Sequence, residues 1–95
     1  MNKYELVVVL DAQKSSSEKE ELYKQIQEAV TKSGGQVLNS HVWLDKQKMT
    51  FSIKRKNEAT YYVVNFQSER SYVTKIKEFL RLNEEILRYL VIGND

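Results

Sequence analysis

The side chains that most often perform catalysis are scarce in this sequence of 95 residues. His41 is the only histidine and there is no cysteine, so a nucleophile paired with a base lacks its usual parts. The same scarcity removes the ligands from which ordinary zinc sites and disulfides are built. Gly34-Gly35 ends a helical pattern instead of opening one, so it is not a phosphate-binding loop. We therefore expect no catalytic residues, no metal site and no cofactor.

Two weaker candidates for chemistry lie near the first loop. Glu18, Glu20 and Glu21 are close in sequence, but acidic side chains are favoured at the start of a helix, which explains them better than metal binding. Acylphosphatase-like enzymes need an arginine and a phosphate cradle after their first strand. Residues 11–15 contain no arginine and no glycine, so an enzyme of this kind is the least favoured interpretation.

Aromatic and basic residues share the strand-like parts of the sequence, and this combination favours contact with RNA. Aromatic rings stack on unpaired bases, and lysine and arginine bind phosphates. The residues concerned are the aromatic Tyr4, Trp43, Phe51, Tyr61 and Tyr62 and the basic Lys3, Lys46, Lys48, Lys54 and Arg55. Aromatic residues also favour strands for packing alone, so both interpretations stay open. Residues 57–66 lack the basic-glycine-aromatic opening of an RNA-recognition motif, so sequence-specific reading of single strands is a minor alternative.

Positive charge is concentrated in the middle of the chain, although the formal net charge is only +2. Residues 35–68 hold five basic and two acidic side chains, whereas residues 1–34 hold five and six, and residues 69–95 hold five of each. A local basic surface attracts phosphate even when the net charge is small. Lysines on an edge hairpin also prevent aggregation, and on charge alone that interpretation is favoured.

Hydrophobic patterns predict two helices among four strands, in the order β-α-β-β-α-β. The strands are expected at 4–10, 36–53, 61–66 and 86–92, one helix ends at Gly34-Gly35, and the other covers about 69–82. The alternation of apolar residues fails around residues 43–48, which indicates a bulge or a turn within the second strand. Residues 54–58 are expected to form a polar connection.

Capping residues mark the ends of both expected helices. Ser15 and Ser17 each have capping-box spacing to a glutamate, so either can begin the first helix. Ser68 is placed to cap the second helix, and Asn83 can close it in the left-handed conformation. The apolar residues around that end, which packing explains most simply, are Phe79, Leu80, Ile86 and Leu90.

With right-handed crossovers, this order of elements predicts the fold class α+β, as a ferredoxin-like βαββαβ two-layer sandwich. A four-stranded antiparallel sheet would carry two helices on one face, and residues 1–95 would form a single domain. The first and third strands are expected in the centre of the sheet, and the second strand at an edge. The predicted core consists of Leu6, Val8, Leu10, Ile26, Val30, Val64, Phe66, Ile76 and Leu80.

Four stretches of this sequence resemble those of one family in order and spacing. They are Tyr4 to Leu10, Lys46 to Ile53, Ala59 to Phe66 and Phe79 to Val91. The chain resembles the bacterial small-subunit ribosomal protein six family over nearly its whole length. It departs from the family's pattern in the second strand, where Trp43 is not followed by the usual glycine and Ser52 replaces a proline. These departures concern the bulge of that strand, and without the proline an edge strand gains another backbone donor.

The resemblance implies a structural constituent of the small ribosomal subunit, on cytoplasmic ribosomes, with no enzymatic activity, cofactor or small-molecule substrate. Family members pair with protein eighteen of the same subunit, and the pair binds the central domain of the small-subunit ribosomal RNA during assembly. The N-terminus has no signal-peptide shape and no apolar run is long enough to cross a membrane, so no membrane partner is expected. The competing interpretation is a ferredoxin-like protein-interaction or regulatory module that does not bind RNA.

Candidate binding residues follow from the resemblance and from side-chain chemistry. The expected RNA-binding residues are Lys3, Tyr4, Lys46, Lys48, Phe51, Lys54, Arg55, Arg81 and Arg88. The partner protein is expected to contact the second-strand edge and the exposed sheet face through Val7, Val9, Trp43, Tyr61 and Val63. An exposed apolar patch of this kind would need covering.

Overall fold

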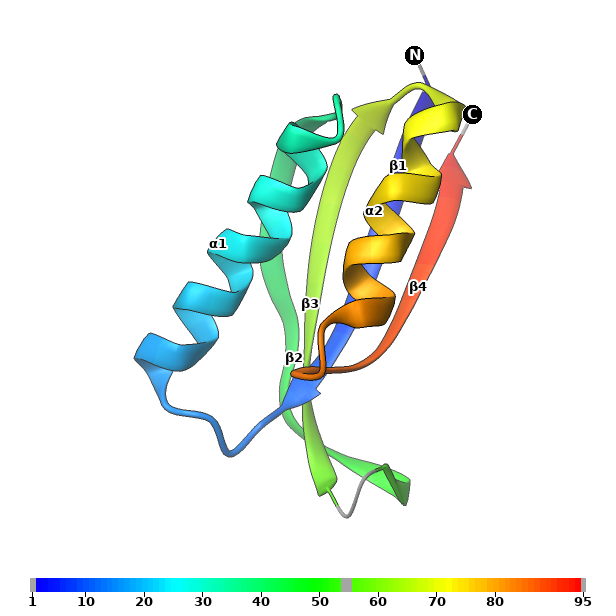
Figure 1. The fold of residues 1–95 in the computed structure, drawn as a ribbon. Helices are drawn as coiled ribbons and strands as arrows, with labels where there is room; N and C mark the ends of the chain where they lie inside the picture. The colour runs from blue at the N-terminus through cyan, green and yellow to red at the C-terminus, as the bar shows by residue number, and fades with distance from the viewer. Residues whose placement is uncertain (1, 54–55, 95) are drawn as a thin grey trace.

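Helices and strands follow one another in the predicted order (Figure 1). The structure is a computed structural model that describes residues 2–53 and 56–94, with the side chains of residues 2–43 and 58–93. The elements within these ranges are β1 (Asn2–Asp11), α1 (Ser16–Lys32), β2 (Gln36–Ile53), β3 (Lys56–Ser68), α2 (Arg70–Leu82) and β4 (Ile86–Asn94).

The strands form one antiparallel sheet in the order β2-β3-β1-β4. Both helices cover the same face of this sheet, and the opposite face, here called the helix-free face, carries no helix of the described residues (Figure 1). β1 and β3 are central, which suits β1 because it contains the β-branched run Val7-Val8-Val9 and half of its residues are buried. This arrangement confirms the predicted ferredoxin-like sandwich and its second strand at an edge.

The core lies between the sheet and the two helices. Side chains alternate along a strand, so every second residue of β1 and β3 points toward the helices. Every residue predicted for the core is buried: Leu6, Val8, Leu10, Ile26, Val30, Val64, Phe66, Ile76 and Leu80. Leu22 of α1 and Val73 of α2 join them at helical spacing, so each helix buries one apolar stripe.

α1 begins at one of the two predicted capping boxes. The Oγ of Ser15 accepts a hydrogen bond from the backbone N–H of Glu18 at 3.2 Å, and Oε1 of Glu18 accepts from the backbone N–H of Ser15 at 3.2 Å. The Ser15 hydroxyl also donates to that carboxylate oxygen at 2.9 Å. These bonds hold the pKa of the Glu18 carboxyl below its ordinary value of 4.5, and the hydrogen bond from the Ser15 hydroxyl has a larger effect than the one from the Ser15 backbone. Ser17 lies inside the helix and is not its cap.

α1 ends where the glycine pair predicts. Gly34 has a φ of 97°, in the left-handed region that favours glycine, and its N–H donates to the carbonyl of Thr31 at 3.1 Å. A Cβ atom at Gly34 would lie 2.8 Å from two ring carbons of Tyr72, in the first turn of α2. The end of α1 and the start of α2 therefore meet closely at this glycine.

Of the two predicted caps of α2, the first is wrong and the second is right in position but not in conformation. Ser68 is the last residue of β3, and its hydroxyl donates to the carbonyl of Glu69 at 2.9 Å instead of accepting from the helix. Glu69 takes the N-cap position without a side-chain hydrogen bond. Asn83 is the C-cap of α2, and its backbone N–H donates to the carbonyls of Phe79 and Leu80, but its backbone is extended, with φ −86° and ψ 110°, and not left-handed. Its side-chain oxygen accepts from the N–H of Glu85 at 2.9 Å in the turn that follows.

β2 and β3 form a long hairpin with irregular pairing. The register shifts between Val37 and Asn39, Val42 and Leu44, Leu44 and Gln47, and Lys48 and Ile53. Two of these shifts fall where the lost alternation predicts a bulge, which confirms that prediction. β3 begins at Lys56, so part of the expected polar connection at 54–58 is strand. Lys54 and Arg55 lie outside the described residues.

Candidate interface for RNA and a partner protein

The helix-free face has an apolar centre. Residues that pair directly across strands point to the same face, and the register places Val63 of β3 between His41 of β2 and Val7 of β1. Val7 in turn pairs with Leu90 of β4. This row crosses the whole sheet, and only its β2 member is polar.

A second row runs beside the first. Tyr61 of β3 pairs with Val9 of β1, which pairs with Arg88 of β4. The indole of Trp43 on β2 meets the ring of Tyr61 edge to face, with ring centroids 5.9 Å apart, and Trp43 is 57% exposed. We call the apolar members of the two rows in β1, β3 and β4, together with Trp43, the apolar patch: Val7, Val9, Trp43, Tyr61, Val63 and Leu90. It contains every residue predicted to bind a partner protein, although Val9 and Val63 are themselves nearly covered.

Sequence reasoning missed the contribution of β4. Leu90, expected to pack, is 57% exposed, and Ile92 is also exposed, whereas Ile86 is buried. The run Leu90-Val91-Ile92 is apolar at every position, so alternation cannot show which residues face the helices. The pairing of Leu90 with Val7 decides this, because Val7 lies on the helix-free face.

Tyr4, expected at the RNA, and Tyr62, for which packing and base stacking both stayed open, pack on the helix-covered face. The ring of Tyr4 stacks on Phe66 with centroids 5.4 Å apart and is 9% exposed, and the ring of Tyr62 stacks on Tyr23 at 4.0 Å. The Tyr62 hydroxyl accepts a hydrogen bond from Nε2 of Gln27 at 2.7 Å. Both rings are packed in the core, which favours the packing interpretation for Tyr62, and the expected RNA contact of Tyr4, which only its hydroxyl edge could make, stays a prediction.

The sequence matches one family along nearly its whole length. The family model described as ribosomal protein S6 matches residues 3–93. The chain belongs to the ribosomal protein S6 family. It is 41% identical to the small ribosomal subunit protein bS6 of Micrococcus luteus over 92 residues, which cover 97% of this chain and 90% of that protein. It is 30% identical to bS6 of Clostridium acetobutylicum over 93 residues, which cover 98% and 97%.

A solved S6 structure has the same fold. The crystal structure of 30S ribosomal protein S6 from Thermotoga maritima superposes with a TM-score of 0.88 at 20% identity, covering 98% of this chain and 87% of that chain. Membership of the S6 family makes this chain a structural protein of the small ribosomal subunit, associated with the ribosome, and not an enzyme. Within residues 2–53 and 56–94, no helix is long and apolar enough to cross a membrane.

Two of the basic residues predicted for RNA lie on either side of the turn from α2 to β4 of this S6-family chain. Arg81 is in the last turn of α2 and Arg88 lies on β4, and both line a hollow of about 400 Å³ at that turn. Arg81 also forms an exposed ion pair with Glu78 at 2.6 Å. Exposed ion pairs contribute little to stability, so a phosphate could replace Glu78 as the partner of Arg81 at little cost in free energy. Lys3 is exposed at the start of β1, on the helix-free face, where it pairs with Gln67 and Asn94.

The RNA contacts expected of the basic residues in the β2–β3 hairpin stay predictions. Lys46, Lys48 and Phe51 belong to β2, but their side chains lie outside the described part of the chain, as Lys54 and Arg55 do entirely. Among the side chains that are described, no group of three or more histidines, aspartates and glutamates could hold a metal ion. The described interface therefore consists of an apolar patch with cations at its margins.

Proposed function

We propose that this S6-family protein binds the central domain of the small-subunit ribosomal RNA together with ribosomal protein eighteen, in the cytoplasm, during ribosome assembly and translation. The apolar patch carries the proposal, because a cluster of exposed apolar side chains at the centre of a sheet favours a protein cover in water. The family resemblance suggests that the covering protein is ribosomal protein eighteen. No small-molecule substrate and no membrane is part of this function.

Trp43 is the expected anchor of the protein contact. Its ring is more than half exposed and already rests against Tyr61, so a partner that covers it restricts little additional motion. Val9 and Val63 beside it are nearly buried and give the patch a closely packed floor. Aromatic anchors in such surroundings supply much of the binding free energy at protein interfaces.

The expected RNA contacts surround this patch. Arg88 pairs with Val9 in the second row, and Lys3 lies at the end of β1, so both are cations at the margin of the apolar surface. Lys46, Lys48, Lys54 and Arg55 add positive charge to the hairpin by sequence. A partner on the patch and a phosphate backbone at its margin would touch each other, which predicts that the two ligands bind cooperatively.

RNA binding by the protein pair tests this function. The chain, protein eighteen and an RNA fragment of the central domain are combined in pairs and together, at one fixed salt concentration because phosphate contacts make affinity depend on salt. We expect the pair to bind RNA at least about tenfold more tightly than either protein alone. Equal affinities would contradict the proposal, and a stable homodimer of this chain that ignores RNA would favour the interaction module without RNA.

Truncation of the anchor adds a matched control. Trp43→Ala should weaken binding of protein eighteen by a factor of about 30, which corresponds to about 2 kcal/mol. Leu82→Ala removes an equally exposed apolar side chain from the end of α2, away from the patch, and should leave the affinity unchanged. If both variants lose the same affinity, the patch is not the docking surface.

A further inference from the structure

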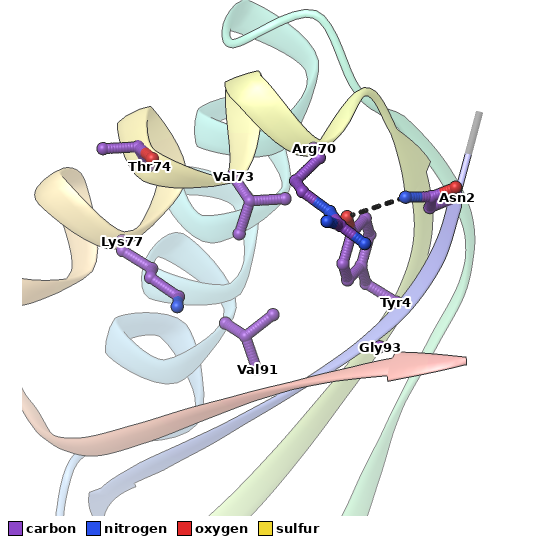
Figure 2. Close-up of a pocket in the computed structure, with 8 residues that line it drawn as sticks. All are labelled: Asn2, Tyr4, Arg70, Val73, Thr74, Lys77, Val91 and Gly93. Atoms are coloured by element: carbon purple, nitrogen blue, oxygen red, sulfur yellow. Dashed lines mark hydrogen bonds between the residues drawn. The ribbon is translucent and has the colours of Figure 1, made fainter. Parts of the chain in front are cut away.

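A pocket lies between α2 and the paired ends of β1 and β4 (Figure 2). Its volume of about 280 Å³ is several times the roughly 30 Å³ that one water molecule occupies in the liquid. Residues of α2 form one wall and β1 forms another, while Val91 and Gly93 of β4 form the floor. None of the predicted RNA-binding residues except Tyr4 lines it.

Two cations of α2 face this pocket. Arg70 and Lys77 are two helical turns apart and so lie on one side of the helix. In Figure 2 the guanidinium of Arg70 reaches over Tyr4, and Lys77 extends toward β4. The lining contains no acidic side chain, and within the described side chains neither cation has an ion-pair partner, whereas Arg81 and Lys32 each pair with a glutamate. Two positive charges that share a pocket in which the described residues supply no counter-charge favour an anion.

Neutral hydrogen-bond donors line the same space. The Tyr4 hydroxyl accepts a hydrogen bond from Nδ2 of Asn2 at 3.4 Å, which leaves its own hydrogen available for another acceptor. Thr74 adds a second hydroxyl from the same side of α2 as the two cations. A guanidinium, an ammonium and hydroxyls are together the donor set that binds phosphate oxygens.

Gly93 keeps the floor of the pocket open. It pairs with Tyr4 across the sheet, and a Cβ atom there would lie 3.6 Å from Cε1 of the Tyr4 ring, an ordinary contact distance. Its backbone is not left-handed, since Gly34 is the one glycine with positive φ in the described chain. A larger side chain at position 93 can therefore be accommodated, and it would fill the space over the Tyr4 ring.

We propose that this pocket binds a phosphate group of the ribosomal RNA backbone. The inference rests on the proposed function, which supplies RNA as the phosphate-rich partner. The position of the pocket favours a strand of RNA over a free anion, because a further cation of α2 lies beyond it. Arg81 lies about 16 Å farther along α2 than Arg70, at 1.5 Å per residue, whereas Lys3 lies on the opposite, helix-free face of the sheet.

Removal of the two charges, with a matched control, tests the site. Arg70→Gln/Lys77→Gln removes both cations and keeps residues that favour helix. Lys24→Gln/Lys75→Gln removes the same charge from exposed helix positions outside the pocket. With protein eighteen bound, the pocket variant should bind the RNA fragment about tenfold more weakly, and its salt dependence should flatten by about one unit of slope for each phosphate that is no longer bound. The control should keep the slope of the unaltered protein.

Filling the pocket without changing its charge gives an independent variant. Gly93→Val should weaken RNA binding as the double variant does, while circular dichroism and the thermal midpoint report that the sheet is intact. Inorganic phosphate, added at constant ionic strength, should shift the amide resonances of Tyr4 and Lys77 in the unaltered protein only. The assignment to RNA would be overturned if inorganic phosphate saturated the pocket below about 1 mM while the double variant and Gly93→Val kept the RNA affinity of the unaltered protein. The pocket would then be a site for a free anion.

The failure of this inference differs from the failure of the proposed function. If the unaltered pair binds the RNA fragment and both pocket variants bind it equally well with the same salt slope, the phosphate site is wrong and the proposed function stands. If the unaltered pair does not bind the fragment at any salt concentration, the proposed function fails and the RNA assignment of the pocket fails with it.

Discussion

The two faces of the sheet use the same residue types for opposite purposes. Tyr61 and Tyr62 are neighbours in β3, yet Tyr62 stacks on Tyr23 of α1, whereas Tyr61 meets the exposed Trp43 on the helix-free face. One step along a strand moves a side chain from one face to the other. The aromatic content of a strand therefore predicts neither core nor interface until the face of each residue is known.

The faces also differ in how complete they are. On the helix-covered face, Phe66 and Leu6 are fully buried by the helices of the chain itself. On the helix-free face, Val63 is nearly buried, but Trp43 and Leu90 on the same face remain more than half exposed. One face is thus closed by this chain alone, and the other is only partly closed, as expected of a surface that a second protein completes.

The largest expected effect is the difference in stability lost when an aromatic ring is removed from each face. Phe66→Ala removes a fully buried ring and should lower the free energy of unfolding by about 3–5 kcal/mol. Trp43→Ala removes an even larger ring that is more than half exposed, so it should lower the same free energy by less than about 1 kcal/mol. Urea unfolding of the isolated variants measures both values. Similar losses in the two variants would mean that the helix-free face is part of the core in solution.

The core could be predicted from sequence because its signal is local. Leu6, Val8 and Leu10 alternate within a β-branched strand, and each helix repeats its apolar residues at helical spacing, so the buried stripe can be read without the partner strands. The cap role of Ser68 and the left-handed conformation of Asn83 were predicted wrongly for the opposite reason. Several residues near each helix end can satisfy the free backbone groups, and the strands that precede and follow α2 decide which of them does.

The interface could be predicted only in part. The face of Tyr4 follows from alternation, because Tyr4 lies two residues before Leu6 and shares its side of β1. The type of the residue, which suits buried and exposed positions equally, suggested RNA instead. Leu90 belongs to an apolar run that looks the same from both faces. The pocket of Figure 2 joins α2 to residues at both ends of the chain, and the spacing of Arg70 and Lys77 is its single local signal.

An intermediate effect is expected where the two helices meet. Gly34→Ala forces a side chain into the left-handed region and places its Cβ atom 2.8 Å from the Tyr72 ring, so the free energy of unfolding should fall by about 1–3 kcal/mol. Gly93→Ala is the matched control, because its backbone is not left-handed and its nearest contact is at 3.6 Å. It should change stability by less than about 0.5 kcal/mol.

The contribution of the Tyr72 ring can be separated by a double variant. Gly34→Ala in a Tyr72→Ala background keeps the backbone strain but removes the steric contact, so the loss of stability should be smaller there. An equal loss in both backgrounds would show that backbone conformation alone explains the glycine. Neither residue belongs to the apolar patch, so binding of protein eighteen should be unchanged in every folded member of this series.

The smallest expected effect concerns the start of α1 and depends on pH. Hydrogen bonds from Ser15 lower the pKa of the Glu18 carboxyl in the folded protein, so the ionised form stabilises the fold at neutral pH. This contribution is complete above the ordinary pKa of 4.5 and is lost as the pH falls through the lower pKa of the folded protein. Glu18→Gln can still accept the capping hydrogen bond but does not titrate. The stability advantage of the unaltered protein over this variant should therefore shrink from about pH 4.5 downward.

Urea unfolding at a series of pH values measures this difference, and Ser15→Ala supplies its control. The Ser15 hydroxyl is the largest cause of the lowered pKa of Glu18. In the Ser15→Ala background, the difference in unfolding free energy caused by Glu18→Gln should therefore vary much less with pH. A stability difference between the unaltered protein and Glu18→Gln that stays constant through the acid range would mean that the capping box does not persist in solution. Because α1 covers only one face of the sheet, binding of protein eighteen to the apolar patch should not follow this titration while the chain remains folded. If the affinity for protein eighteen fell with the same pH profile, the two faces would be energetically coupled through the sheet. The two faces would then differ in how exposed their side chains are, but they would not act independently.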